Sequence, residues 1–347
     1  MAEIGDIICK KYKVLEVLGQ GGMSLVYLTE DLKLQKRWAV KEIRGTQEAW
    51  FLHSAIAEIT VMKKLDHPAL PRIVDVIEAG NSIYVIMDYV EGESLSSLLN
   101  RREKITHEQI LKWTKELCEV LCYLHEQNPP IIYRDIKPAN VIISGSGSVK
   151  LIDFGCAREY KEESNEDTMN LGTRGYAAPE QFGGGGQTDE RTDIFSLGMM
   201  LYQLLTGEKP WEWNGYLGKN KWGKGKLTGA WEYIIKKCTF KNPNLRYQSC
   251  MELRKELNNY EKLNKKYQKK KKWKERWRHC LKSTMMVFVL SMLTFTVLQN
   301  IEEILVFWED GEMLREIIEK AEKIKLFSAL KSMLDSFFQE IRQFLNL

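Results

Sequence analysis

The sequence of 347 residues lacks several features that would place it in common protein classes. It has no CxxC pair and no Cys/His cluster with zinc spacing, which argues against a structural zinc site. Its seven cysteines are scattered and odd in number, which argues against a disulfide framework and favours a reducing compartment. No internal repeat is visible, and residues 1–19 contain no uninterrupted apolar stretch, so a cleaved signal peptide is not expected.

Composition allows a packed core but hides an uneven charge. The hydrophobic fraction is 44% and the length suits one large domain with an appendage, or two domains of ordinary size. The formal net charge is only +4, yet a dense run of Lys and Arg lies between Lys262 and Lys282. This run predicts a local basic surface that the overall charge does not reveal.

The hydrophobic pattern predicts a β-rich first part and a helical second part. The expected strands are Tyr12–Leu18, Ser24–Thr29, Arg37–Ile43, Ile73–Glu78 and Ile83–Met87, with one helix at Ala49–Leu65. The expected later helices are Leu95–Leu99, Thr106–Glu126, Asp189–Thr206, Ala230–Cys238 and Cys250–Tyr260, interrupted by a hairpin of Val141–Ile143 and Val149–Ile152. We therefore expect an α+β fold with two lobes and a cleft between them.

A glycine-rich loop lies between the first two expected strands. Gly19, Gly21 and Gly22 would let backbone N–H groups approach phosphate oxygens closely, although a plain hairpin turn would look the same. Lys41 lies on the expected strand Arg37–Ile43, and Glu58 lies on the helix that follows. The two side chains could form an ion pair.

The segment from residue 131 to 140 concentrates the chemistry. It places Asp135, Lys137 and Asn140 within six positions after an apolar run, and the hairpin that follows ends in Asp153-Phe154-Gly155. Phosphoryl transfer needs a carboxylate that orients the attacking hydroxyl, ligands for Mg²⁺ and cations against phosphate charge. The segment supplies all three kinds of group.

In this order, the motifs resemble the signature set of protein kinases from about Tyr12 to Tyr260. The glycine loop and the sequence Pro-Glu-Gln-Phe from residue 179 are similar to bacterial serine/threonine kinases of the eukaryotic (Hanks) type. The resemblance implies a two-lobed kinase fold, ATP as cofactor and proteins with Ser or Thr as substrates. Lys137 and Thr173 match serine/threonine rather than tyrosine kinases.

The resemblance also implies roles for individual residues. Asp135 would be the catalytic base, and Lys137 would stabilise the transferring phosphate. Asn140 and Asp153 would ligate Mg²⁺, with Mn²⁺ as an alternative. The implied ATP-binding residues are Leu18, Gly19, Gly21, Gly22, Ser24, Val26, Ala39, Lys41, Glu58, Met87, Asp88, Val90 and Ile142.

Within that set, the apolar members would sandwich adenine, while Asp88 and Val90 would offer backbone hydrogen bonds. For the apolar members, packing in the core is an equally good interpretation. The resemblance further implies a buried ion pair between Glu180 and Arg246. It also implies a bracing role for Asp193 beneath the catalytic loop.

Two departures from the family pattern concern the loops. Ser24 replaces the third glycine, and Tyr133 replaces the usual histidine before Arg-Asp. One alternative function is a pseudokinase that binds nucleotide without transferring phosphate, but Lys41, Asp135 and Asp153 are all present. Another is a membrane anchor or assembly protein in which the kinase fold is secondary.

The expected activation loop carries three candidate phosphorylation sites. They are Ser164, Thr168 and Thr173. A phosphate at Thr168 could pair with Arg134 and order the loop. Alternatively, the acidic residues of this loop are simply solvated, or already imitate that charge.

An apolar, uncharged stretch follows the basic run. The predicted organisation is a kinase domain at 1–260 (N-lobe about 10–90, C-lobe about 91–260), a basic juxtamembrane segment at 261–282, a transmembrane helix at 283–299 and an amphipathic tail at 300–347. The basic run would keep the kinase domain cytoplasmic, as a single-pass protein of the cell membrane. Alternatives are a buried helix or a surface helix on anionic lipid. Membrane lipid is favoured over nucleic acid as the partner, and the tail could form a homodimer, pack on another partner or lie on the membrane.

Overall fold

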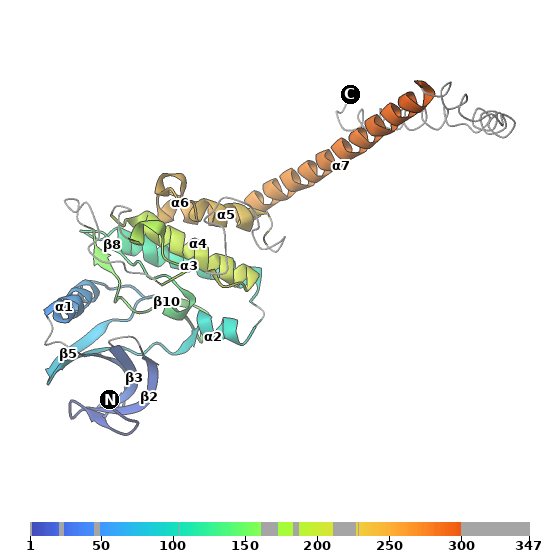
Figure 1. Ribbon diagram of the computed structural model, residues 1–347. Coiled ribbons are helices and arrows are strands. Elements are labelled where there is room, and N and C mark those ends of the chain that lie inside the picture. The colour runs from blue at the N-terminus through green and yellow to red at the C-terminus, as the bar shows by residue number, and fades with distance from the viewer. Residues whose placement is uncertain are drawn as a thin grey trace. The chain divides into compact units, whose positions relative to one another are not determined.

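The computed structural model of the chain describes residues 2–20, 24–44, 49–103, 105–160, 173–182, 187–210, 227 and 229–299 (Figure 1). The chain divides into two compact units, Met1–Lys271 and Lys272–Leu347. The predicted amphipathic tail at 300–347 lies outside the described residues.

A six-stranded antiparallel sheet forms the first lobe of the first unit. Its order is β1 (Ile7–Ile8), β2 (Tyr12–Gln20), β3 (Ser24–Asp31), β4 (Arg37–Arg44), β6 (Ser82–Asp88) and β5 (Ile73–Ala79). Six consecutive residues of β4, Trp38–Ile43, are buried, so both faces of the sheet are covered at this strand. One face packs on α1 (Ala49–Lys63) through Ala55 and Ile59, and the other holds Tyr12, Tyr27 and Trp38.

Helices build the second lobe. They are α2 (Leu95–Asn100), α3 (His107–His125), α4 (Glu190–Thr206), α5 (Ala230–Cys238) and α6 (Cys250–Asn258). A capping box begins α3, because the Thr106 hydroxyl accepts the Gln109 N–H at 3.2 Å and the Gln109 side chain accepts the Thr106 N–H at 2.8 Å. The end of α4 is set by Gly207, whose φ of 73° is left-handed and favours glycine.

Two small sheets carry the loops that bear the chemistry. The predicted hairpin is present as β9 (Val141–Ser144) and β10 (Val149–Leu151), joined by β7 (Gly92–Ser94). A side chain at residue 92 would lie 2.3 Å from the Ile143 carbonyl oxygen, so the close approach of β7 to β9 requires Gly92. A second pair joins β8 (Ile131–Ile132) to β11 (Arg158–Glu159). The expected α+β fold with two lobes is confirmed.

Three short helical turns lie in the connecting segments, at Pro138–Asn140, Pro179–Gln181 and Pro243–Leu245. The predicted helix Cys250–Tyr260 is wrong at its end. Asn259 caps α6 and donates from its side chain to the Lys255 carbonyl at 3.1 Å, and a new helix begins at Tyr260.

That helix, α7, runs over Tyr260–Gln299 and includes the basic run. Its section Tyr260–Thr296 is long and apolar enough to cross a membrane by length and composition, and its apolar window is unburied. The sequence had indicated a helix only for the apolar part, since a run of like charges carries no amphipathic period.

Candidate active site

Strand register places the expected nucleotide residues on one face of the sheet. Val26 of β3 lies opposite Lys41 of β4, and Ala39 of β4 lies opposite Met87 of β6. Because side chains two residues apart share a face, Ala39 and Lys41 point to the same side. The register therefore lines the lysine up with the apolar positions expected to contact adenine.

Lys41 connects the two lobes. Its Nζ lies 2.6 Å from Glu58 Oε1 of α1 and 3.1 Å from Asp153 Oδ1, which follows β10. Lys41 and Glu58 are both buried. Burial alone would lower the pKa of Lys41, but the carboxylates of Glu58 and Asp153 outweigh it and raise that pKa, so the ammonium stays charged.

Asp153 is held in its ionised form by the same contact. Burial would raise the pKa of Asp153, but Lys41 and the Gly155 N–H, which donates to Oδ1 at 3.2 Å, lower it below the ordinary range. Its backbone adopts a φ of 67°, an uncommon left-handed conformation. Such strained positions cluster at functional sites, where the surrounding structure fixes them.

A hydrogen-bonded group surrounds Asp135. Its Oδ2 accepts from Lys137 Nζ at 2.6 Å and from Asn140 Nδ2 at 2.9 Å, and its Oδ1 accepts from the Thr173 hydroxyl at 2.7 Å. The Lys137 ammonium also donates to Thr173 Oγ1 at 2.9 Å. Thr173 lies far along the chain, so the fold brings the activation segment onto the catalytic loop.

Asp193 of α4 fixes the backbone of that loop from below. Its carboxylate is fully buried and accepts the N–H groups of Tyr133 at 2.9 Å and Arg134 at 2.7 Å. His125 Nε2 lies 2.8 Å from the same carboxylate. His125 was missed by the sequence reasoning, since its only signal is a place in the last turn of α3.

Tyr133 takes part in placing Asp153. Its hydroxyl donates to the carbonyl of Ile152, and its ring packs edge-on against Phe154 at 5.3 Å between centroids. Burial raises the pKa of the Tyr133 phenol, so this donor keeps its proton. The tyrosine therefore supports the backbone before Asp153 even though it departs from the usual histidine.

A buried ion pair anchors the segment after Thr173. Arg246 holds Glu180 with two bonds of 2.6 and 2.9 Å, and Thr192 of α4 donates to the same carboxylate at 2.9 Å. Gln181, a second missed residue, donates to the Arg134 carbonyl at 2.9 Å and so ties this segment to the catalytic loop.

The remaining expected site residues lie on strands and loops around this group, or outside the described residues. Leu18 is 41% exposed at the end of β2, and Ala39 is buried, whereas Val26, Met87, Val90 and Ile142 are half-buried. The Asp88 N–H donates to the Arg72 carbonyl at 3.0 Å, so only the Asp88 carbonyl remains for a ligand. Gly19 and Ser24 lie in β2 and β3, while Gly21, Gly22, Ser164 and Thr168 lie outside the described residues.

Two side-chain oxygen atoms of the site suit a divalent cation shared with phosphate. Asn140 uses its amide nitrogen toward Asp135, and Asp153 uses Oδ1 toward Lys41, which leaves Asn140 Oδ1 and Asp153 Oδ2 as hard ligands. Among the described residues, no group of three His, Cys, Asp or Glu side chains forms a complete metal cage. This fits Mg²⁺, which usually binds through one or two protein oxygens together with substrate phosphates.

Comparison with known proteins agrees with this geometry. The protein kinase domain family matches residues 12–296. The chain is 33% identical over 268 residues to serine/threonine-protein kinase PknB of Mycobacterium tuberculosis H37Rv, covering 71% of this chain and 42% of PknB. It is 31% identical over 264 residues to serine/threonine-protein kinase PrkC of Bacillus subtilis, covering 72% of this chain and 40% of PrkC. The chain thus spans about two fifths of the length of these relatives. Since the family match extends over well more than half of the sequence, the chain belongs to the protein kinase domain family, whose members use ATP and a divalent metal.

Proposed function

We propose that this chain is a serine/threonine protein kinase that transfers the γ-phosphate of ATP to protein hydroxyl groups. The observation that carries this proposal is the group formed by Asp135, Lys137 and Thr173 together with the lobe-connecting contacts of Lys41. Both relatives named above are called serine/threonine-protein kinases, which supports the same substrate class.

The geometry suggests how the residues divide the work. Asp135 already accepts a hydrogen bond from a threonine hydroxyl, so its carboxylate can orient a substrate hydroxyl and take up its proton. Lys137 lies beside the same oxygen atoms and can balance charge on the transferring phosphate. Lys41, fixed by Glu58, can bind the α- and β-phosphates.

The cofactors of this proposal are ATP and Mg²⁺, with Mn²⁺ as an alternative. Asn140 and Asp153 would hold the metal, which neutralises phosphate charge when it is bound. Leu18, Val26 and the face of β4 and β6 would contact adenine. These positions do not favour the pseudokinase alternative. Lys41, Asp135 and Asp153 are all present, and Lys41 pairs with Asp153.

Phosphorylation of the activation loop is part of the proposal. The Thr173 hydroxyl is engaged by both Asp135 and Lys137, which supports a structural role for it. Thr168 and Ser164 are therefore the favoured acceptors, with Thr168 first. Both follow Cys156 in the same loop, and the Cys156 carbonyl accepts from Arg134 Nε at 2.7 Å.

We also propose that residues 283–299 hold the enzyme in the cell membrane as a single pass, with the kinase domain cytoplasmic. Most apolar side chains described in this part of α7 are exposed, among them Phe288 and Leu293. A helix needs about 17–25 mostly apolar residues to span a bilayer, and this segment is at the short end of that range. The Lys/Arg run before it favours a cytoplasmic orientation.

Purified full-length chain with ATP, Mg²⁺ and a generic protein substrate tests the catalytic proposal. We expect phosphate on Ser and Thr, identified by mass spectrometry, and loss of at least about 1000-fold in rate for Asp153→Ala, which removes a metal ligand. Glu16→Ala, an exposed change on β2, serves as the control. Undiminished transfer by Asp153→Ala, or phosphate only on tyrosine, would contradict the proposal.

A further inference from the structure

The basic run of α7 has more positive charge than a membrane orientation signal needs. Residues 262–282 contain eleven Lys or Arg and one acidic residue, Glu275, while the rest of the chain carries more acidic than basic residues. Several lysines repeat at a spacing of four, as Lys262 and Lys266 do, and such like-charge pairs destabilise an isolated helix. An anionic counter-surface would relieve this repulsion.

These cations are also exposed and unpaired. All residues from Lys269 to Lys282 are exposed, and none of the eleven cations forms an ion pair within the part of the chain that the structure describes. Elsewhere in the first unit, lysines such as Lys64 and Lys237 do pair with carboxylates. The charge of the run is therefore available to a partner.

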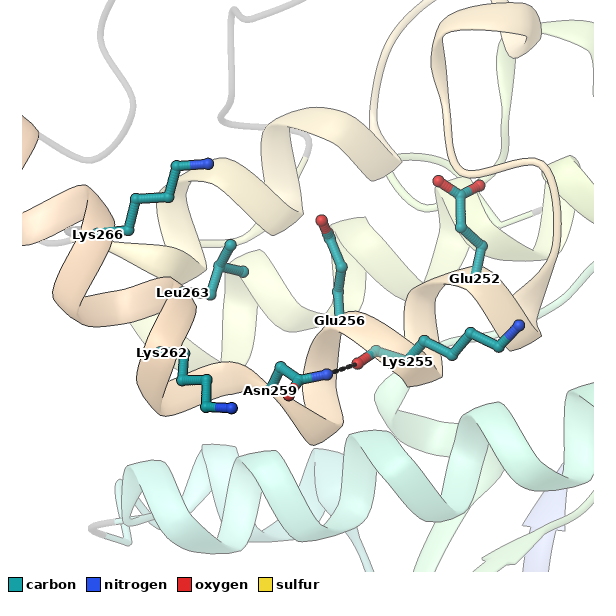
Figure 2. Close-up of a pocket in the computed structure, with 7 residues that line it drawn as sticks. All are labelled: Glu252, Lys255, Glu256, Asn259, Lys262, Leu263 and Lys266. Carbon is teal, nitrogen blue, oxygen red and sulfur yellow. Dashed lines mark hydrogen bonds between the residues drawn. The ribbon is translucent and has the colours of Figure 1, made fainter.

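A groove at the start of this run extends the basic surface onto α6. It has a volume of about 500 Å³ and is lined by Glu252, Lys255, Glu256, Asn259, Lys262, Leu263 and Lys266 (Figure 2). Its two carboxylates are already engaged, since Glu252 pairs with Lys237 at 2.7 Å and Glu256 accepts from the Tyr247 hydroxyl. The groove therefore adds three exposed lysine side chains, whose ammonium groups point in different directions in Figure 2, to the surface that an anion would meet.

Two tryptophans point to lipid as the source of that anion. Trp273 and Trp277 stand one turn apart, with ring centroids 5.7 Å apart, and remain 55% and 41% exposed. Tryptophan is enriched at the level of lipid headgroups, and clusters of Lys and Arg beside an apolar helix bind anionic lipids. A nucleic-acid surface would not explain the apolar residues that follow.

From these observations we infer that residues 262–282, together with the groove lysines at their start, bind the headgroups of anionic phospholipids. This inference rests on the proposed membrane attachment and deepens it, because it names the class of lipid. The surface then selects membranes rich in anionic lipid in addition to holding the chain in them.

Lipid titration of the full-length chain in neutral maltoside micelles tests the inference. The apparent dissociation constants for phosphatidylglycerol and phosphatidylcholine are compared at low salt. We expect phosphatidylglycerol to bind at least about 30-fold more tightly, and raised salt to reduce that preference. A variant with four lysines replaced should bind phosphatidylglycerol about 30-fold more weakly (~2 kcal/mol). Its changes are Lys269→Gln, Lys270→Gln, Lys271→Gln and Lys272→Gln. Two of the four lysines can face one membrane surface, and each contributes about 1 kcal/mol to binding.

Matched variants separate this surface from charge in general. The groove variant with Lys262→Gln and Lys266→Gln should bind phosphatidylglycerol about tenfold more weakly than the wild type. Its melting temperature should be unchanged. A control that removes four exposed lysines of the first lobe should bind phosphatidylglycerol as the wild type does. Its changes are Lys10→Gln, Lys13→Gln, Lys33→Gln and Lys63→Gln.

Four results would overturn the inference. They are equal affinity for the two lipids, an equal loss in the control variant, displacement of phosphatidylglycerol by inorganic phosphate at similar concentration, and tighter binding of duplex DNA than of phosphatidylglycerol. Lipid binding is measured without catalysis, so Asp135→Asn should leave it unchanged. Failure of the kinase proposal and failure of the lipid inference are therefore distinguishable.

Discussion

Glu42 neighbours Lys41 on β4 but points to the opposite face of the sheet, away from the candidate active site. Its buried carboxylate accepts from the Tyr27 hydroxyl at 2.9 Å, from Arg44 at 2.6 Å, and from the hydroxyls of Ser82 and Tyr84 at 3.2 Å each. Burial would raise the pKa of Glu42, but these hydrogen bonds and the charge of Arg44 lower it to about 2. The ionised carboxylate therefore stabilises the first lobe.

Glu42→Gln should lower the free energy of unfolding by about 2 kcal/mol at pH 7, because a tenfold change in proton affinity corresponds to about 1.4 kcal/mol. A lowered folded-state pKa gives stabilisation that is present above the unfolded value of about 4.5 and is lost as pH falls toward 2. Denaturant titrations between pH 7 and pH 2.5 measure this. The variant should show a flatter pH dependence, with exposed Glu16→Gln as the control, and equal slopes for variant and wild type would contradict the account.

Residues of the site differed in how well they could be predicted. Asp135, Lys137 and Asn140 stand within six positions and carry a recognisable order, and the structure brings their side chains together. The contact of His125 could not be predicted, because its partner Asp193 lies 68 residues away in sequence and the pattern around it is that of an ordinary helix. The same holds outside the site for Glu42, whose partners Tyr27, Ser82 and Tyr84 come from other strands. Hydrogen-bond networks of this kind depend on tertiary packing, which a linear motif does not encode.

At the scale of elements, the start of α7 is part of the helical lobe. Tyr267 stacks on Tyr233 of α5 at 4.6 Å between centroids, and Tyr260 packs on Trp231 at 4.9 Å. The Asn264 side chain accepts the Ala230 N–H at 3.2 Å and so caps α5, whose N-cap residue, a glycine, offers no side chain. The sequence had predicted a kinase domain ending at residue 260, which leaves the contacts of Asn264 and Tyr267 outside it.

A protein ending at residue 260 should therefore be less stable than one ending at residue 271. Loss of the stacked tyrosine and of the cap should cost about 1–3 kcal/mol together, from roughly 1 kcal/mol for a cap and a similar amount for an aromatic pair. The measurement is the melting temperature of both proteins, with Tyr267→Ala in the longer protein showing part of the loss. Identical melting temperatures would show that these first turns only border the domain.

Helices and strands with a clear period were predicted well, whereas α7 shows why others were not. Lys262–Lys282 is mostly charged, and Trp273, Trp277 and Leu281 are too few at helical spacing to form the wide apolar stripe that predicts a packed helix. Lys and Arg nevertheless have good helix propensity, and the apolar residues that follow continue the same helix. The boundary after Asn258 was also out of reach, since it depends on a cap formed by the Asn259 side chain.

At the scale of the whole molecule, the order of parts defines the proposed enzyme: a kinase fold, a basic run and an apolar helix. Replacing Leu290 and Leu293 by Arg should release the chain into the soluble fraction, because a charged residue at the centre of a span costs about 2.5–3.5 kcal/mol and a short span has little apolar surplus. Membrane fractionation with an alkaline carbonate wash measures this.

The wild type should resist the carbonate wash, and replacing Leu290 and Leu293 by Ile serves as the control for size and position. A surface-bound helix would instead be stripped from the membrane by the wash. External protease on intact cells should leave the kinase domain uncut. A chain that is soluble without detergent would contradict the membrane proposal and leave the kinase assignment standing.

The central claim is that Asp135 accepts the hydrogen bond of the attacking hydroxyl. Its most direct test is the rate of γ-phosphate transfer by full-length Asp135→Asn, compared with the wild type at saturating ATP and Mg²⁺. The amide keeps one oxygen that can accept from Lys137 and Asn140, but its nitrogen can neither accept from Thr173 nor take up a proton. We therefore predict a fall of about 100- to 10,000-fold in kcat at near wild-type nucleotide affinity, with the melting temperature showing that the variant is folded. A folded Asp135→Asn chain that transfers phosphate at the wild-type rate would contradict the account.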